Sequence, residues 1–166
     1  MIETIAFNDS KYPMFQTKGH ASEFAIPFAK HVCKGVGLDI GCMKEEWAFP
    51  GAKAIDKDFE DEWDAYNIPR EYNNCDYIFS SHCLEHLPNW VTALDYWYEN
   101  LKTNGVLFLY LPHFSQQYWR PWHNRKHVHC FNGDEIESYM KDKGYINIFK
   151  SGVDLNNSFI IMGEKI

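Results

Sequence analysis

Residues 36–43 read Val36-Gly37-Leu38-Asp39-Ile40-Gly41-Cys42-Met43. A short apolar run here ends in an acidic residue and then a glycine. This pattern predicts a buried parallel strand over 36–40 that runs into a tight turn facing a ligand. Glycine allows backbone conformations that other residues avoid and lets a ligand approach the main chain closely. We therefore expect the centre of a sheet, with a binding site at its edge, at this point of the chain.

A second apolar run, 52–55, ends in Asp56. In doubly wound α/β folds, an acidic residue at the tip of the second strand can bind both hydroxyls of a ribose. Asp39 and Asp56 are therefore predicted to project from adjacent strand ends toward one cofactor that contains adenosine. The connection over 44–51 contains a Pro-Gly pair and is too short for a full crossover helix, so we expect a helical turn or two at most.

The remaining periodic segments complete an α/β pattern. Helices are predicted at 22–35, after Pro88 and from Asn132 to Gly144, and strands at 77–80, 106–111, 145–153 and 158–163. Residues 1–19 show no sustained period and are expected to be irregular. Together these segments predict one domain over 1–166, a Rossmann-like α/β fold whose mostly parallel sheet ends in an antiparallel strand at the carboxyl terminus.

Composition limits the classes of function. The 166 residues allow one sizeable core and leave little room for a separate substrate domain. A net charge of -7 disfavours binding to nucleic acid, which needs clustered Lys and Arg. We expect neither a membrane span nor a signal peptide, and hence a cytoplasmic protein. The five cysteines form no Cys-x-x-Cys pair, which favours reduced thiols. No oligomeric state is predicted.

Several motifs, in this order along the chain, resemble the class I S-adenosylmethionine-dependent methyltransferases. Residues 39–43 are similar to the acidic-x-Gly-x-Gly motif of that family, with Met43 in place of the second glycine. Residues 75–87 look like its fourth strand and the following turn, and 101–109 like its fifth strand. The resemblance covers about 35–166 and implies S-adenosylmethionine as the cofactor, with S-adenosylhomocysteine as the product. The short first crossover resembles a compact subgroup.

The resemblance also implies contacts with the cofactor. Asp39 would orient the turn and the methionine part, while Gly41 and Cys42 would offer backbone atoms. Asp56 would bind the ribose, and Lys57 would lie beside the adenine. Further contacts carried over are Asp64 and Ala65 to the adenine, and Ser80, Ser81 and His82 to the methionine part.

His113 is the candidate catalytic residue. It directly follows Pro112, at the carboxyl end of a predicted strand, where ligands of open α/β sheets bind. Histidine exchanges its proton near neutral pH, so it suits a general base or a residue that orients the acceptor. The alternative is a histidine that only hydrogen-bonds a loop.

The loop over 114–131 combines aromatic, histidine and basic side chains. Such a mixture suits a pocket for the methyl acceptor with a cationic rim, and the basic residues favour an anionic acceptor. Packing of the aromatic rings onto the sheet is an equal alternative. The predicted acceptor-binding residues are Tyr118, Trp119, Trp122 and His123.

The spacing His123-x-x-x-His127-x-His129-Cys130 is one that could ligate zinc. Pro121 and Gly133 argue against a regular helix there, so no metal site is predicted. His86 is expected to be structural, and Cys42 and Cys83 to be small packing residues.

The sequence thus predicts an S-adenosylmethionine-dependent methyltransferase that acts on a small-molecule acceptor, at oxygen or nitrogen. A nicotinamide-dependent oxidoreductase is less favoured, because the Gly-x-Gly-x-x-Gly spacing is absent. A catalytically silent module that binds the cofactor or a partner is the alternative from a different class.

Overall fold

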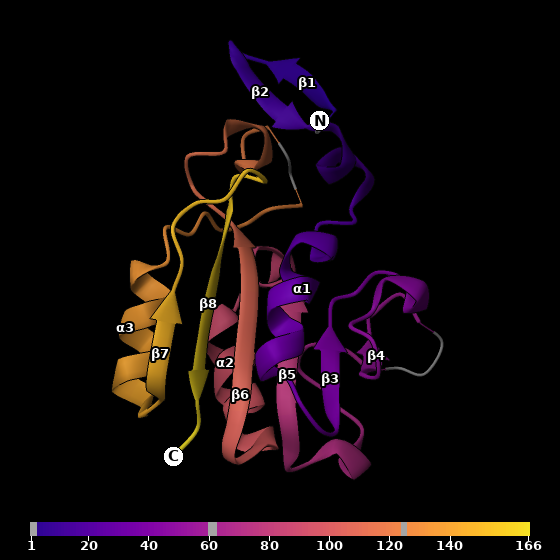
Figure 1. Ribbon diagram of the computed structural model, residues 1–166, viewed down its shortest axis with the longest axis vertical. Helices are drawn as coiled ribbons and strands as arrows, with labels where there is room; N and C mark the ends of the chain where they lie inside the picture. Colours follow the sequence, from indigo (N-terminus) through magenta and orange to yellow (C-terminus); the bar gives the residue numbers. More distant parts are fainter. Residues whose placement is uncertain (1–2, 60–62, 124–125) are drawn as a thin grey trace.

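The computed structural model describes residues 3–59, 63–123 and 126–166, and within these residues six strands form one sheet in the order β4-β3-β5-β6-β8-β7 (Figure 1). β3, β4, β5 and β6 are parallel, β8 is antiparallel to β6, and β7 is antiparallel to β8. This confirms the predicted fold class. The strands are β3 (Gly37–Ile40), β4 (Lys53–Ile55), β5 (Cys75–Ser81), β6 (Leu101–Pro112), β7 (Ile146–Lys150) and β8 (Ser158–Glu164).

Three helices, α1 (Ser22–Val32), α2 (Trp90–Asn100) and α3 (Asp134–Lys143), cover the two faces of this sheet (Figure 1). Successive side chains of a strand point to opposite faces. Tyr77 and Phe79 of β5 therefore pack with α1, while Ile78 belongs to the larger core cluster with α2 and α3. The alternation places one hydrophobic core on each side of the sheet, and the central strands are buried on both faces, as parallel strands usually are.

The connection between β3 and β4 is as short as predicted, since it contains only the 3-10 turn η2 (Glu45–Trp47). The predicted start of β6 at residue 106 is wrong, because the strand begins at Leu101. Pairing with β5 shifts register between Cys75 and Tyr77, and Asn104 has a φ of 63°. The predicted Asn104-Gly105 turn is therefore an irregularity within the strand.

The expectation of an irregular amino terminus is wrong for residues 4–13. β1 (Thr4–Phe7) and β2 (Ser10–Pro13) form a hairpin, which η1 (Met14–Lys18) connects toward α1 (Figure 1). Its two-residue turn needs positive φ at both positions, and Asn8 and Asp9 supply values of 44° and 61°. These two residue types tolerate that conformation, which was the available signal in the sequence.

No helix in the described part of the chain is long and apolar enough to cross a membrane.

Candidate active site

The tips of β3 and β4 lie side by side at the same edge of the sheet. The strands are parallel with Ile40 opposite Ile55, and the Gly41 N–H donates to the Ile55 carbonyl at 2.8 Å. Asp39 and Asp56 therefore sit at the carboxyl ends of neighbouring strands, as predicted. Their carboxylates are close enough for the charge of Asp56 to raise the pKa of Asp39.

The turn after β3 depends on left-handed backbone at two positions. Gly41 has a φ of 84°, and a Cβ atom there would lie 2.4 Å from the Cβ and Sγ atoms of Cys83. Met43, which replaces the second glycine of the family motif, has a φ of 64°. Methionine thus adopts here a conformation that favours glycine. The main chain at Gly41 approaches Cys83, in the segment after β5, so closely that only glycine fits.

Asp39 is almost completely buried beneath this turn. Its Oδ2 atom accepts the Phe49 N–H at 2.7 Å, which ties the short crossover to β3. Its Oδ1 atom is buried and has no hydrogen-bond partner among the described residues. Burial raises the pKa of Asp39 to about 7, although the Phe49 N–H opposes the shift. An oxygen of this kind suits a cationic group of a ligand, such as an α-amino group.

Asp56 organises the far side of the same turn. One carboxylate oxygen accepts the Met43 N–H at 2.7 Å, and the other accepts the Asp58 N–H at 3.1 Å. Lys57 is exposed beside it. Cys42 is buried between the two acids, and burial, together with the charges of Asp39 and Asp56, raises the pKa of its thiol to about 12. Cys42 is therefore a neutral packing residue rather than a nucleophile.

The three residues predicted at the tip of β5 differ in what their side chains do. The Ser80 hydroxyl is buried and donates to the Ile40 carbonyl at 2.8 Å, so it holds the strand tips together. Ser81 is partly exposed, but its hydroxyl oxygen is buried without a partner among the described residues. His82 has a φ of 50° and a hydrogen bond of 2.9 Å between its Nε2 and Ser158 Oγ. Burial, with a contribution from nearby histidines, lowers the pKa of His82 to about 3.

Asp64 and Ala65 lie against α2. The Ala65 carbonyl accepts the buried indole N–H of Trp97 at 2.7 Å, and Asp64 accepts the Tyr66 N–H within its own loop. Both groups are thus engaged within the protein. Among the described residues, β4 is the last strand of the sheet on this side, so Asp64 and Ala65 follow the edge strand without a further strand before them.

A hollow of about 820 Å³ lies among Trp63, Arg70, Tyr96 and Asn100, close to the amino end of β5. The proposed cofactor site is at the opposite, carboxyl edge of the sheet. We therefore do not connect this hollow with the cofactor.

Comparison with known proteins agrees with this arrangement. The sequence model of a methyltransferase domain matches residues 19–148. The chain belongs to this methyltransferase family. Comparison with curated protein sequences gives no match.

Several solved structures share the fold. One is a SAM-dependent methyltransferase from Thermotoga maritima, described as a possible histamine N-methyltransferase, with 15% identity over 92% of each chain and a TM-score of 0.68. Another, from Archaeoglobus fulgidus, has 16% identity over 92% of this chain and 98% of that one, with a TM-score of 0.63. The 1,6-didemethyltoxoflavin-N1-methyltransferase of Burkholderia thailandensis, solved with its acceptor and S-adenosylhomocysteine, has 13% identity over 88% and 77% and a TM-score of 0.62. The resemblance to class I S-adenosylmethionine-dependent methyltransferases is confirmed.

In this methyltransferase, His113 lies where β6 ends. Its N–H donates to the Asn157 carbonyl at 3.0 Å, and its ring Nδ1 lies 2.7 Å from Ser115 Oγ. Its ring also meets Phe159 edge-on, with 6.1 Å between the ring centroids. Partial burial lowers the pKa of His113, so the ring is neutral near pH 7 and can accept a proton.

The predicted acceptor loop contacts the amino-terminal hairpin and η1 through Tyr118, Trp119 and His123, whereas Phe131 at its end packs in the core beside the sheet. Tyr118 and His123 both meet the Phe7 ring edge-on, with centroids 5.2 and 4.9 Å away. Trp119 donates its indole N–H to Gln16 Oε1 at 2.7 Å. Trp122 is 68% exposed. The guanidinium carbon of Arg120 lies 5.3 Å from the centroid of the Trp122 ring. The basic residue Arg125 lies outside the described residues. The sequence analysis offered an acceptor pocket or packing onto the sheet, and neither alternative included contacts with the amino-terminal hairpin.

The zinc spacing noted in the sequence does not bring its histidines together. His123 packs on Phe7, and the His129 ring donates to the Pro88 carbonyl at 3.2 Å. His127 turns instead toward Glu85, a residue that the sequence analysis did not single out. The available signal was the spacing His82-x-x-Glu85-His86, which places three ligand-type side chains within one turn.

Proposed function

We propose that this protein transfers the methyl group of S-adenosylmethionine to the oxygen or nitrogen of a small molecule. The observation that supports this most is the pair Asp39 and Asp56 at neighbouring strand tips, joined by the left-handed turn at Gly41 and Met43. That edge of an open α/β sheet is where nucleoside cofactors bind.

Five features of the chain would hold the cofactor. The unpartnered Oδ1 of Asp39 would receive the α-amino group, and the backbone of 41–43 would line the site. Asp56 would accept the ribose hydroxyls with the lone pairs that Met43 and Asp58 leave free. Lys57 would lie beside the adenine, and Ser81 with His82 would border the methionine part. When bound, S-adenosylmethionine supplies a sulfonium methyl group that is already electrophilic.

His113 is the residue that we propose as the base. Its neutral ring at the end of β6 would take the proton that the acceptor hydroxyl or amine loses, while Ser115 fixes the ring orientation. The hairpin and the loop over 113–123 would exclude water from the reaction.

Arg120 supports an acceptor with a negative charge. Its Nε donates to the Phe114 carbonyl at 2.9 Å, so the guanidinium is held at the loop surface beside Trp122. Arginine is suited to carboxylate and phosphate groups. The Burkholderia enzyme, solved with bound 1,6-didemethyltoxoflavin, is a precedent for a small-molecule acceptor on this fold.

Calorimetry with S-adenosylhomocysteine and with NAD tests this proposal. We expect S-adenosylhomocysteine alone to bind, and methyl transfer to at least one member of a broad panel of hydroxyl and amine acceptors. Binding without transfer to any acceptor would favour the catalytically silent module. Binding of NAD alone would favour an oxidoreductase, and binding of neither would contradict the proposed cofactor.

A further inference from the structure

The side chain of Glu85 is buried in an unusual environment. It belongs to the 3-10 turn η4 (Leu84–His86), which follows β5, and it is 0% exposed. Neither carboxylate oxygen has a hydrogen-bond partner among the described residues. A buried carboxylate without donors is costly, because it loses its hydration and gains nothing in return. The position therefore calls for a cationic partner.

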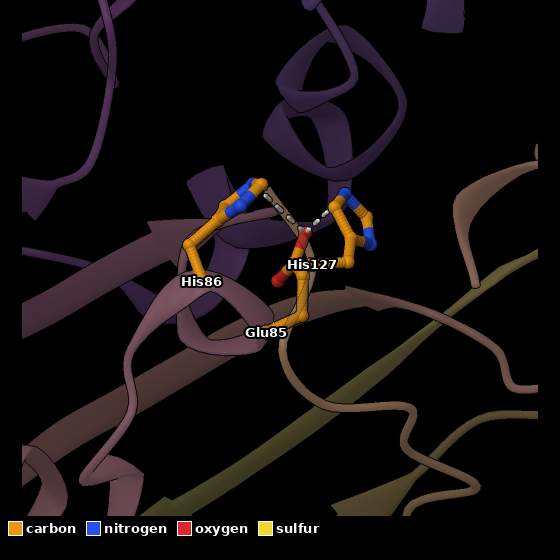
Figure 2. A group of neighbouring side chains, drawn as sticks. All are labelled: Glu85, His86 and His127. Carbon is orange, nitrogen blue, oxygen red and sulfur yellow. Dashed lines mark ion pairs between the residues drawn. The ribbon is translucent and has the colours of Figure 1, made fainter. Parts of the chain in front are cut away.

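The rings of His86 and His127 face this carboxylate (Figure 2). The Nε2 atoms of His86 and His127 lie 3.7 and 3.9 Å from the same oxygen, Oε1, and His82 Nδ1 is also 3.9 Å away. These separations are too long for hydrogen bonds. Ligand atoms that share a zinc ion at 2.0–2.2 Å stand about 3–4 Å apart. The spacing is therefore that of ligands around a metal ion.

The protein fixes His86 and His127 by further contacts. His86 Nδ1 donates to the Lys126 carbonyl at 2.8 Å, so the neutral ring keeps its lone pair on Nε2, which faces Glu85. The Val128 and His129 N–H groups donate to the Glu85 carbonyl at 2.9 and 3.1 Å. These bonds clamp the loop to η4, and Trp119 stacks on the His127 ring at 5.2 Å. The three side chains are thus held facing one another before any ion binds.

We propose that Glu85, His86 and His127 form a binding site for one divalent transition-metal ion of the zinc class. Within residues 3–59, 63–123 and 126–166, they are the one group of at least three His, Cys, Asp or Glu side chains with ligand atoms all within 4.8 Å of one another. Two imidazoles favour zinc, cobalt or iron over magnesium. Three protein ligands leave a coordination position open to water or another oxygen donor. His82 borders the site from the side of Ser158.

The test uses the full chain without a histidine tag, stripped of metal with EDTA and titrated with cobalt(II), followed by competition with zinc(II). We expect the visible absorption to saturate at one ion per chain. Glu85→Gln and His127→Ala should each weaken binding ten-fold or more. His129→Ala is the matched control, because it removes a ring of the same loop that faces Pro88, and it should bind as the wild type does.

Failure to saturate at one ion per chain would overturn the proposal, and so would equal binding by wild type and His127→Ala. If circular dichroism shows that Glu85→Gln does not fold, His86→Ala replaces it, since that ring is 35% exposed. X-ray absorption should show nitrogen and oxygen ligands only, and sulfur from Cys130 would contradict the site. The residues proposed to bind S-adenosylhomocysteine are not ligands here, so its calorimetry tests the methyltransferase proposal separately.

Discussion

One edge of the sheet has two halves that are built in different ways. The cofactor half consists of the tips of β3 and β4, and the acceptor half consists of the tips of β5, β6 and β8. The first half comes from residues 37–56, in which both aspartates bind backbone N–H groups only 10 and 13 residues away in sequence. The second half joins segments 100 residues or more apart, since Gln16 binds both Gln116 and Trp119. We infer that the cofactor half depends on a local motif, whereas the acceptor half depends on tertiary packing.

The largest expected effect is on the local motif. Gly41→Ala adds a Cβ atom 2.4 Å from Cys83 at a φ of 84°, so it should cost about 2–5 kcal/mol of unfolding free energy and abolish S-adenosylhomocysteine binding. Gly51→Ala is the control, because Gly51 has a φ of 88° but no atom within 4 Å of the added Cβ. Denaturant unfolding of both variants checks this. Equal losses would show that close packing at Gly41 is unimportant.

The same contrast explains what the sequence could and could not predict. Asp39, Gly41 and Asp56 were found because strand ends and a tight turn leave a local pattern. The cluster around Glu85 was missed, because His127 reaches it through a loop fixed by backbone hydrogen bonds that no spacing rule encodes. The hairpin over 4–13 was missed because its turn uses Asn8-Asp9 rather than a glycine.

In the acceptor half, His113→Ala should lower kcat/KM ten-fold or more while the dissociation constant of S-adenosylhomocysteine stays unchanged. Burial lowers the pKa of His113, so the activity of the wild type should decline on the acid side only below the pH at which histidine usually titrates. The variant should lose this decline. Steady-state kinetics from pH 5 to 9 measure both. An unchanged rate would remove His113 from the mechanism.

Gln16→Ala tests whether η1, which follows the hairpin, positions the acceptor loop. The buried amide of Gln16 donates to the Asn156 carbonyl and accepts from Trp119 and Gln116, so its loss should cost about 1–3 kcal/mol. We expect the KM of the acceptor to rise several-fold with no change in cofactor affinity. Lys11→Ala, on the exposed surface of the neighbouring hairpin, is the control. A rise in the cofactor dissociation constant instead would mean that the two halves are coupled.

The smallest expected effect concerns the buried charge of Asp39. Its pKa is about 7 in the folded protein and near 3.8 ordinarily, so the folded state binds the proton more tightly. The contribution of Asp39 to the free energy of unfolding should therefore be largest below pH 4 and should decrease as the pH rises to about 7. Asp39→Asn cannot ionise, so its melting temperature should fall by several degrees less than that of the wild type between pH 5 and pH 8. Parallel pH dependences in thermal melts would contradict this.

The central claim is that Asp39 and Asp56 bind the two parts of one cofactor from adjacent strand tips, and calorimetry of S-adenosylhomocysteine with Asp56→Ala and Asp58→Ala tests its ribose contact most directly. Both variants remove one carboxylate from the same acidic segment, and only Asp56 is proposed to touch the ribose. We predict a dissociation constant at least ten-fold weaker for Asp56→Ala and unchanged for Asp58→Ala. Wild-type affinity in Asp56→Ala would contradict the account.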